Sequence, residues 1–305
     1  MKTKFCIVSD GSCDLPEDIT RKKDISIVHF YVSFDGVDYK KEGIDIPLAE
    51  FYQQMVEHPK SYPKSAAPSP DDFYQVFESR VKAEQKDIIC ICISSKLSAS
   101  AQSAEIAKNM IQENYPDVKV TVLDSLSTTL MQGAYVLEVC RMRDAGYTSD
   151  EAAAAMQCLI KTGRILFTVG DLDYLQHGGR IGKVTSIAGT LLNVKPLITL
   201  QDGEIHSSGI RRGRRKSLTG VIDLLISYLK DNNCTPDDCR ILIGYCYDYD
   251  EACRFKEMTI AELKKIYGIV TDIPICRIGA TIGVHAGPYS IGYGIIRRYD
   301  RPFSS

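Results

Sequence analysis

Hydroxyl side chains gather in one stretch of this 305-residue chain, "IICICISSKLSASAQSAEIAKNMI", which runs from Ile88 to Ile111. Its first residues are apolar enough for a buried strand, and its later residues have helical spacing. Because a helix N-terminus presents free N–H groups and a partial positive charge, hydroxyls at such a junction can cap the helix or help to hold an anion. Five serines occupy the junction: Ser94, Ser95, Ser98, Ser100 and Ser103.

Four interpretations of this serine cluster stay open on the residues alone. Ser98 or Ser100 can simply cap the helix. A phosphate cradle would lack the G-x-x-x-x-G-K-[ST] pattern, and a nucleophilic serine would lack the G-x-S-x-G elbow. A triad of Ser98, His285 and an acid, either Asp10 or Asp124, depends on geometry that the sequence does not give. The fourth interpretation is a carboxylate seat, because each charge-assisted hydrogen bond contributes about 1.5–3 kcal/mol.

The composition is that of a globular protein with a sizeable core, at 44% hydrophobic and 25% charged residues. A net charge of −2 gives no global attraction to nucleic acid or membrane. The N-terminus shows no signal peptide and no apolar run spans a bilayer, so we expect a cytoplasmic protein. We predict no metal site, because the spacing of the nearest cysteine group matches no zinc motif: Cys234, Cys239, Cys246 and Cys253.

The order of the predicted elements indicates an α/β fold with two domains. Strands at 88–93 and 118–123 alternate with helices at 101–113 and 129–145, which favours a mostly parallel sheet. The second half contains "RILFTV", "KPLITLQ" and "EIHSSGI", whose alternation and tight turn favour a mixed sheet. We therefore predict an N-terminal α/β domain over residues 1–160 and a C-terminal mixed-sheet α/β domain over residues 161–305, with a ligand at their junction.

A set of short segments, taken in order, resembles the DegV family over essentially the whole chain. The segments are "IVSDGSCDLP", "KSAAPSPDDF", "ISSKLSASAQSAEIA", "VLDSLSTTLMQG", "LDYLQHGGRIGK", "VKPLI" and "HAGPYSIG". DegV proteins are bacterial fatty-acid-binding proteins that act as the lipid-carrying subunit of fatty acid kinase. The resemblance implies a non-catalytic protein without a cofactor, whose ligand is a long-chain fatty acid and whose partner is the kinase catalytic subunit.

The resemblance also implies roles for particular residues. It implies that the hydroxyls of Ser65, Ser98 and Ser100 and the side chain of His285 bind the fatty acid carboxylate. It also implies that Arg180 and Arg212 bind the phosphate or dock the kinase. The sequence departs from the family where "KSAAP" replaces the usual K-T-S-Q-P, and where Ala99 replaces the glycine of L-S-G-T. The hydroxyls survive these changes, but alanine has less conformational freedom at that turn than glycine.

A buried acyl tail accounts for affinity without a cation at the head. Each buried methylene contributes about 0.8 kcal/mol, so some fifteen of them offer on the order of 12 kcal/mol before ordering costs. Ordinary core packing is the alternative for such residues and explains most apolar periodicity. The candidate tail contacts are Leu166, Phe167, Ile187, Leu191 and Leu192.

The segment "IRRGRRKS" concentrates positive charge at residues 211–216. It can be a solvated helix start, a nucleic-acid patch or a docking face for an acidic partner. Without interleaved aromatic residues or a DNA-binding motif, we expect no nucleic-acid partner. We expect no transmembrane segment and leave a transient membrane-surface contact open. The alternative function is a serine hydrolase that acts on a lipid-like ester through Ser98 and His285.

Overall fold

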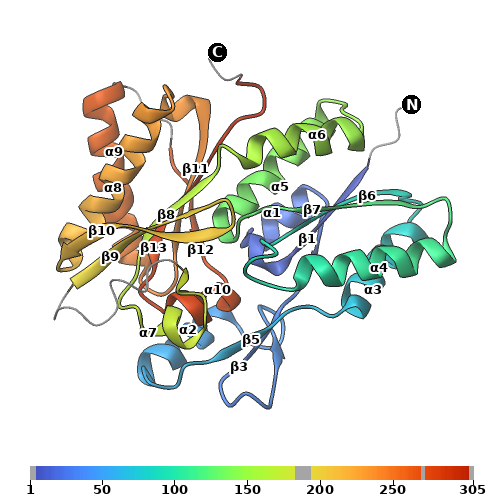
Figure 1. Ribbon diagram of the computed structural model, residues 1–305, viewed down its shortest axis with the longest axis horizontal. Helices are drawn as coiled ribbons and strands as arrows, with labels where there is room; N and C mark the ends of the chain where they lie inside the picture. Colours follow the sequence, from blue (N-terminus) through green and yellow to red (C-terminus); the bar gives the residue numbers. More distant parts are fainter. Residues whose placement is uncertain (1–4, 183–193, 269–271, 302–305) are drawn as a thin grey trace.

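The computed structural model describes residues 5–182, 194–268 and 272–301, which build three sheets and the helices that cover them (Figure 1). The first sheet has the strand order β2-β1-β6-β7, and every neighbouring pair is parallel. The second sheet has the order β10-β9-β8-β13-β11-β12, and only β11 and β12 run parallel. These two sheets confirm the predicted α/β class, with a parallel sheet in the first half and a mixed sheet in the second.

The parallel sheet is buried on both faces, so its strands read as continuous apolar runs. Alternate residues of β6 enter two different cores: Ile88 and Cys90 pack with α3 and α4, and Ile89 and Ile91 pack with α5 and α6. Its elements are β1 (Cys6–Asp10), β2 (Ile25–Val28), β6 (Asp87–Cys92), β7 (Lys119–Asp124), η1 (Gly11–Cys13), α1 (Glu17–Lys22), α3 (Pro70–Lys82), α4 (Ser100–Asn114), α5 (Thr129–Asp144) and α6 (Ser149–Ile160).

The mixed sheet carries α8 and α9 on one face, which bury Leu166, Ile243 and Tyr293 against Leu225 and Phe255. Its opposite face turns toward α5. Its elements are β8 (Arg164–Thr168), β9 (Val194–Gln201), β10 (Glu204–Arg212), β11 (Cys239–Tyr245), β12 (Ile275–Arg277), β13 (Ile291–Arg297), α7 (Asp173–His177), α8 (Arg214–Asp231), η3 (Pro236–Asp238), α9 (Tyr249–Tyr267) and α10 (Ala280–Ala286).

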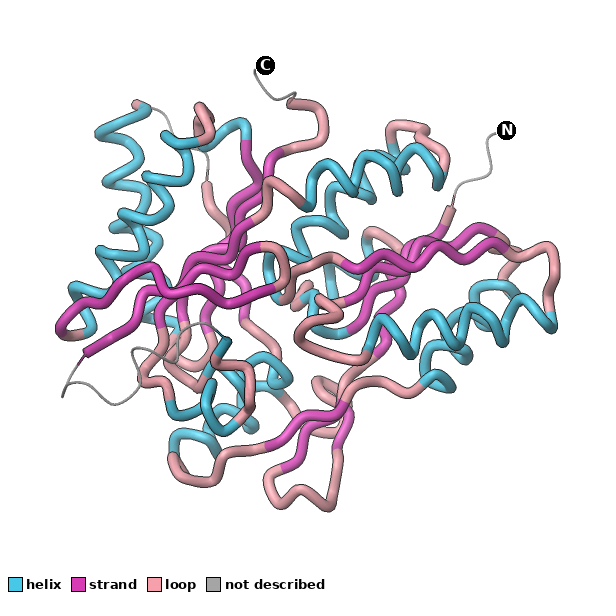
Figure 2. The backbone as a smooth tube through the Cα atoms, viewed as in Figure 1, coloured by secondary structure: helices cyan, strands magenta, loops and turns pink. Residues whose placement is uncertain are grey.

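The third sheet was not foreseen as a separate unit. It is a small antiparallel sheet of order β4-β3-β5, formed by β3 (Tyr31–Ser33), β4 (Lys40–Lys41) and β5 (Lys64–Ala66), with α2 (Leu48–Glu57) connecting β4 to β5. Val32 pairs with Ser65 across it. The sequence did not indicate that the chain leaves the parallel sheet after β2. The tube in Figure 2 shows this small sheet apart from the two large ones, and the excursion brings Ser65 to His285 of α10.

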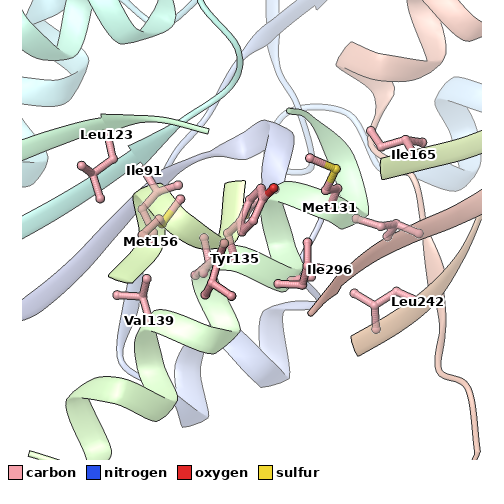
Figure 3. Close-up of a cluster of buried hydrophobic side chains, with 14 of the residues drawn as sticks. Ile91, Leu123, Met131, Tyr135, Val139, Met156, Ile165, Leu242 and Ile296 are labelled. Atoms are coloured by element: carbon pink, nitrogen blue, oxygen red, sulfur yellow. The ribbon is translucent and has the colours of Figure 1, made fainter. Parts of the chain in front are cut away.

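The helix α5 links the two large sheets. Its side chains Met131, Tyr135 and Val139 lie in one continuous core with Ile91 of β6 and with Ile296 of β13 (Figure 3). The predicted boundary at residue 160 coincides with the last residue of α6, where the chain passes from one sheet to the other. The division into domains stays a prediction, because this core is shared by both halves.

Within the described ranges, no helix combines the length and the apolar character that a membrane crossing needs.

Candidate functional site: a hydroxyl-rich cavity between the sheets

The loops that follow β1, β6 and β7 meet at the carboxyl edge of the parallel sheet, where ligands of open α/β sheets commonly bind. The carboxylate of Asp10 lies at the centre of this edge and is fully buried. It accepts hydrogen bonds from Ser12 Oγ and Gln132 Nε2 on one oxygen, at 2.7 and 2.8 Å. Its other oxygen accepts from Ser100 Oγ at 2.7 Å and from the Ile93 amide at 2.9 Å.

This network decides the place of Ser100. Its side chain is fully buried with its hydroxyl on Asp10, and it is absent from the described lining of the cavity beside it. Burial raises the pKa of Asp10, while the hydrogen bonds from Ser12, Ser100 and Gln132 oppose that shift. The hydrogen bond from Ser100 to Asp10 therefore fixes the start of α4 to β1. Of the predicted pair, only Ser98 lines the cavity.

The loop before α4 presents Ser98 without strain. Ser98 lines the cavity, and its Oγ accepts a long hydrogen bond of 3.3 Å from the Ser100 amide, so it also caps the helix. Ala99 is the N-cap residue with a φ of −78°, a value that any residue adopts. The replacement of the family's glycine by alanine therefore leaves this turn unstrained.

Ser65 and His285 meet although 220 residues separate them. Ser65 Oγ lies 3.0 Å from His285 Nε2, and both side chains line the cavity with Ser98. The small sheet supplies Ser65, and α10 supplies His285 from its last turn. Gly178, at the end of α7, allows this arrangement, because a Cβ there would lie 2.2 Å from His285 Nδ1.

His285 is a neutral imidazole at neutral pH. Burial lowers its pKa to about 4, and the positive charge of Arg180 acts in the same direction. A neutral ring accepts on one nitrogen and donates on the other. Depending on the tautomer, Ser65 either donates to His285 or accepts from it. In the second case the Ser65 proton is free to donate to a ligand oxygen.

The cavity itself has a volume of about 260 Å³ and runs between the two large sheets. Apolar side chains from both halves of the molecule make up most of its described walls. They are Phe30, Ile93, Leu97, Leu130, Ile165, Phe167, Leu175, Leu200, Ile205, Ile278, Ile282 and Ile291. The combination of an apolar interior with a few hydroxyls and one imidazole suits an amphiphile with a long apolar body.

The predicted tail contacts divide into three groups. Phe167 lines the cavity. Leu166 lies on the opposite face of β8, packed into the core below α8, because consecutive residues of a strand point to opposite faces. The prediction treated the two neighbours as one group and missed Ile165, which does line the cavity. Ile187, Leu191 and Leu192 lie outside the described residues.

Arg180 lies at the polar end of the cavity and is exposed. Its guanidinium donates to the carbonyl oxygens of Gly178, at 2.7 Å, and of Leu97, at 3.3 Å, and makes no ion pair with a described residue. A second hollow of about 480 Å³ adjoins it and shares Leu97 and Arg180 with the cavity. Lys96 also lines this hollow, where it donates to the Asp202 carbonyl at 2.9 Å and pairs with Glu204, another lining residue, at 3.4 Å.

The structure places Arg212 away from these features. It is an exposed residue at the end of β10 and lines neither the cavity nor the hollow within the described chain. Part of the 211–216 cluster has a structural role, since Arg214 pairs with Glu251 and donates to the Tyr289 carbonyl.

The triad that a serine hydrolase would need is not assembled. The hydrogen-bonding partner of His285 is Ser65, not Ser98. The carboxylate of Asp10 is engaged by Ser12, Ser100 and Gln132, as described above. Asp124 accepts from the Leu126 amide at 2.8 Å and from the Ser95 amide, in the loop after β6, at 3.2 Å. The described residues thus give the hydrolase alternative no geometric support.

Three threonines of the cavity wall escaped the sequence reasoning: Thr128 and Thr129 at the start of α5, and Thr281 in α10. The segment "DSLSTTL" contributed only to the family resemblance. Its position directly after β7 was the signal available, because the carboxyl ends of β6 and β7 must meet at the same edge.

Comparison with known proteins settles the family. A model of the DegV family of uncharacterised proteins matches residues 4–298. The chain belongs to the DegV family. It is 33% identical over 290 residues to a DegV domain-containing protein of Caldanaerobacter subterraneus subsp. tengcongensis, covering 95% of this chain and 97% of that protein.

Solved DegV structures add a ligand to the comparison. A stearic-acid-binding protein from Eubacterium ventriosum matches with a TM-score of 0.91 and 38% identity, covering 97% of this chain and 99% of that one. A DegV family protein from Thermus thermophilus, described by its fatty acid binding, matches with a TM-score of 0.84 and 27% identity over 96% and 99% of the two chains. The family resemblance predicted from the ordered motifs is thereby confirmed.

Proposed function

We propose that this DegV protein binds a long-chain fatty acid in the cavity between its sheets. The observation that carries the proposal is the meeting of Ser65 and His285 beside Ser98 at one end of an apolar cavity. In this arrangement the carboxylate takes hydrogen bonds from Ser65 and Ser98, with His285 and the charge of Arg180 nearby. The tail extends along the apolar wall that includes Phe167.

The head group is held by hydroxyls, and the tail supplies most of the affinity. Burial of each methylene contributes about 0.8 kcal/mol, whereas a charge-assisted hydrogen bond contributes about 1.5–3 kcal/mol. Ser100 supports the seat indirectly through its bond to Asp10. The fatty-acid-bound structures of relatives that share the fold support this assignment.

The proposal extends to presentation of the carboxylate to a separate fatty acid kinase, which would form the acyl phosphate. The hollow next to the head group, where a phosphate would be added, is lined by Arg180, which makes no ion pair with a described residue, and by Lys96, which is paired with Glu204. Arg212, exposed at the end of β10, would contact the kinase rather than the phosphate. In this scheme the chain itself is a carrier and catalyses no step.

Two experiments test the proposal in sequence. Protein purified from the cell is extracted with organic solvent, and mass spectrometry should find one equivalent of a long-chain fatty acid. A preparation free of lipid that also fails to take up added octadecanoic acid would rule the binding function out.

The second experiment tests presentation to the kinase. Loaded protein incubated with ATP and the kinase subunit of a related bacterium should give acyl phosphate. Arg180→Gln should slow this step more than it weakens binding. Equal effects on the two would remove Arg180 from the phosphate site.

A further inference from the structure

A second polar wall of the cavity lies at the start of α5 and in the first turn of α10, the helix whose last turn carries His285. Thr128 and Thr129 form it where α5 begins, together with Thr281 in the first turn of α10. All three line the cavity, and their exposed fractions are 6%, 5% and 3%. A buried hydroxyl needs a hydrogen-bond partner, and the alkyl chain of a fatty acid offers none to these three threonines.

Two of these hydroxyls are already paired. Thr129 Oγ1 donates to Asp14, and Thr281 Oγ1 donates to Glu42. Thr128 differs, since its Oγ1 is buried and finds no hydrogen-bond partner among the described residues. It does not cap its own helix either. Buried hydroxyls are rarely left in this state, so Thr128 points to a group supplied by the ligand.

The surroundings of Thr128 favour a neutral oxygen over a carboxylate. Asp14 and Glu42 lie behind the threonine wall, and both approach Gly279: a Cβ there would lie 2.5 Å from Asp14 Oδ1 and 2.1 Å from Glu42 Oε1. Burial raises the pKa of Asp14, and the negative charge of Glu42 acts in the same direction. A third anion here would meet the same repulsion, whereas the end of the cavity near Arg180 would attract it.

We propose that Thr128 pairs with an oxygen atom on the acyl chain, so that the cavity prefers a hydroxy or oxo fatty acid to the unsubstituted acid. This inference rests on the proposed function and names the substrate class of the same cavity. A threonine hydroxyl both donates and accepts, so it suits a hydroxyl or a keto oxygen. The free N–H groups at the start of α5, a helix of 16 residues, add a favourable potential for either oxygen.

The test is a binding series measured by isothermal titration calorimetry on delipidated protein. The ligands are octadecanoic acid and its monohydroxy and mono-oxo derivatives, with the substituent moved stepwise along the chain. One narrow range of positions should bind about tenfold more tightly than the unsubstituted acid, the fold-change expected for one buried hydrogen bond. Derivatives outside that range should bind more weakly than the unsubstituted acid, because their oxygen is buried without a partner.

Thr128→Val tests the residue itself, with Thr128→Ser as the matched control. Valine keeps the shape, tolerates the extended φ of −158°, and removes no helix cap. The valine variant should bind the unsubstituted acid more tightly and lose the preference for the oxygenated acid, whereas the serine variant should keep it. If valine is not tolerated in the fold, Thr128→Ala provides the same comparison.

The outcomes separate the two proposals. If octadecanoic acid binds but no derivative binds more tightly, or if the preference survives in Thr128→Val, the Thr128 inference is overturned and the fatty acid site stands. If the wild-type protein binds none of these acids, both proposals fall.

Discussion

Two groups of serine hydroxyls, one around Asp10 and one beside the cavity, differ in how far their hydrogen bonds are taken up within the protein. Around Asp10, the hydroxyls of Ser12 and Ser100 bond to the protein and are fully buried. Beside the cavity, Ser65 and Ser98 are half-buried and face an apolar interior. The first, closed group hydrogen-bonds within the protein and the second, open group lines the cavity, although both consist of the same residue type. A polar cluster is therefore a candidate site only when its hydrogen-bonding capacity is left open.

The largest effect on stability should come from removing Asp10, the centre of the closed group's hydrogen bonds. Asp10→Ala removes the acceptor of the Ser100 hydroxyl and of the Ile93 amide, both buried, and one hydrogen bond each from Ser12 and Gln132, which keep the bond between them. We expect the free energy of unfolding to fall by about 3 kcal/mol, the sum of a few unpaired buried groups less the cost of burying the carboxylate. Urea denaturation measures this. Asp117→Ala, at an exposed residue of a surface ion pair, is the control and should cost under about 1 kcal/mol.

The sequence could not separate these two groups of serines. One member of each, Ser100 and Ser98, occurs in "SSKLSAS", and their spacing allows either one to face a ligand. The deciding contact is with Asp10, which is 90 residues away. The order of strands and helices was predictable, because apolar runs and helical spacing are local. The position of Ser65 beside His285 depended on the third sheet and on the close approach at Gly178, which no local pattern encodes.

The family resemblance narrowed the site further than the residue types did. It selected Ser65, Ser98 and His285, which the structure brings to one cavity. It did not indicate which face of β8 lines that cavity, so Leu166 was chosen together with Phe167. Nor did it draw attention to Thr128. Side-chain direction and unsatisfied hydrogen bonds emerge only once tertiary packing is known.

The next largest effect should be on ligand affinity and concerns Ser98 of the open group. Ser98→Ala should weaken the binding of octadecanoic acid by roughly 30-fold, since one charge-assisted hydrogen bond to the carboxylate is worth about 2 kcal/mol. Displacement of a fluorescent fatty acid measures the affinity. Ser95→Ala is the matched control: Ser95 lies three residues earlier, is exposed, and does not line the described part of the cavity. An equal loss in both variants would show that the loop's conformation, and not the Ser98 hydroxyl, matters.

A smaller effect should appear in the titration of His285. Its folded-state pKa of about 4 lies below the ordinary value, so the stability it contributes is present at neutral pH and is lost as the pH falls from about 6.5 toward 4. A bound carboxylate favours the charged ring, and we expect loading to raise this pKa by about one unit, or about 1.4 kcal/mol. NMR of the imidazole measures both states. A pKa that does not change on loading would place the carboxylate elsewhere in the cavity.

The smallest effect should come from Ser100→Ala, and its direction distinguishes the two groups most cleanly. Ser100 donates one hydrogen bond to a buried carboxylate that keeps its other partners, so the free energy of unfolding should fall by about 1 kcal/mol. The affinity for octadecanoic acid should change less than twofold, because the hydroxyl does not reach the cavity. Urea denaturation and fluorescent displacement on the same preparation, beside Ser98→Ala, separate the two quantities. If Ser100→Ala loses affinity while its stability is unchanged, Ser100 binds the carboxylate and must be assigned to the open group with Ser65 and Ser98.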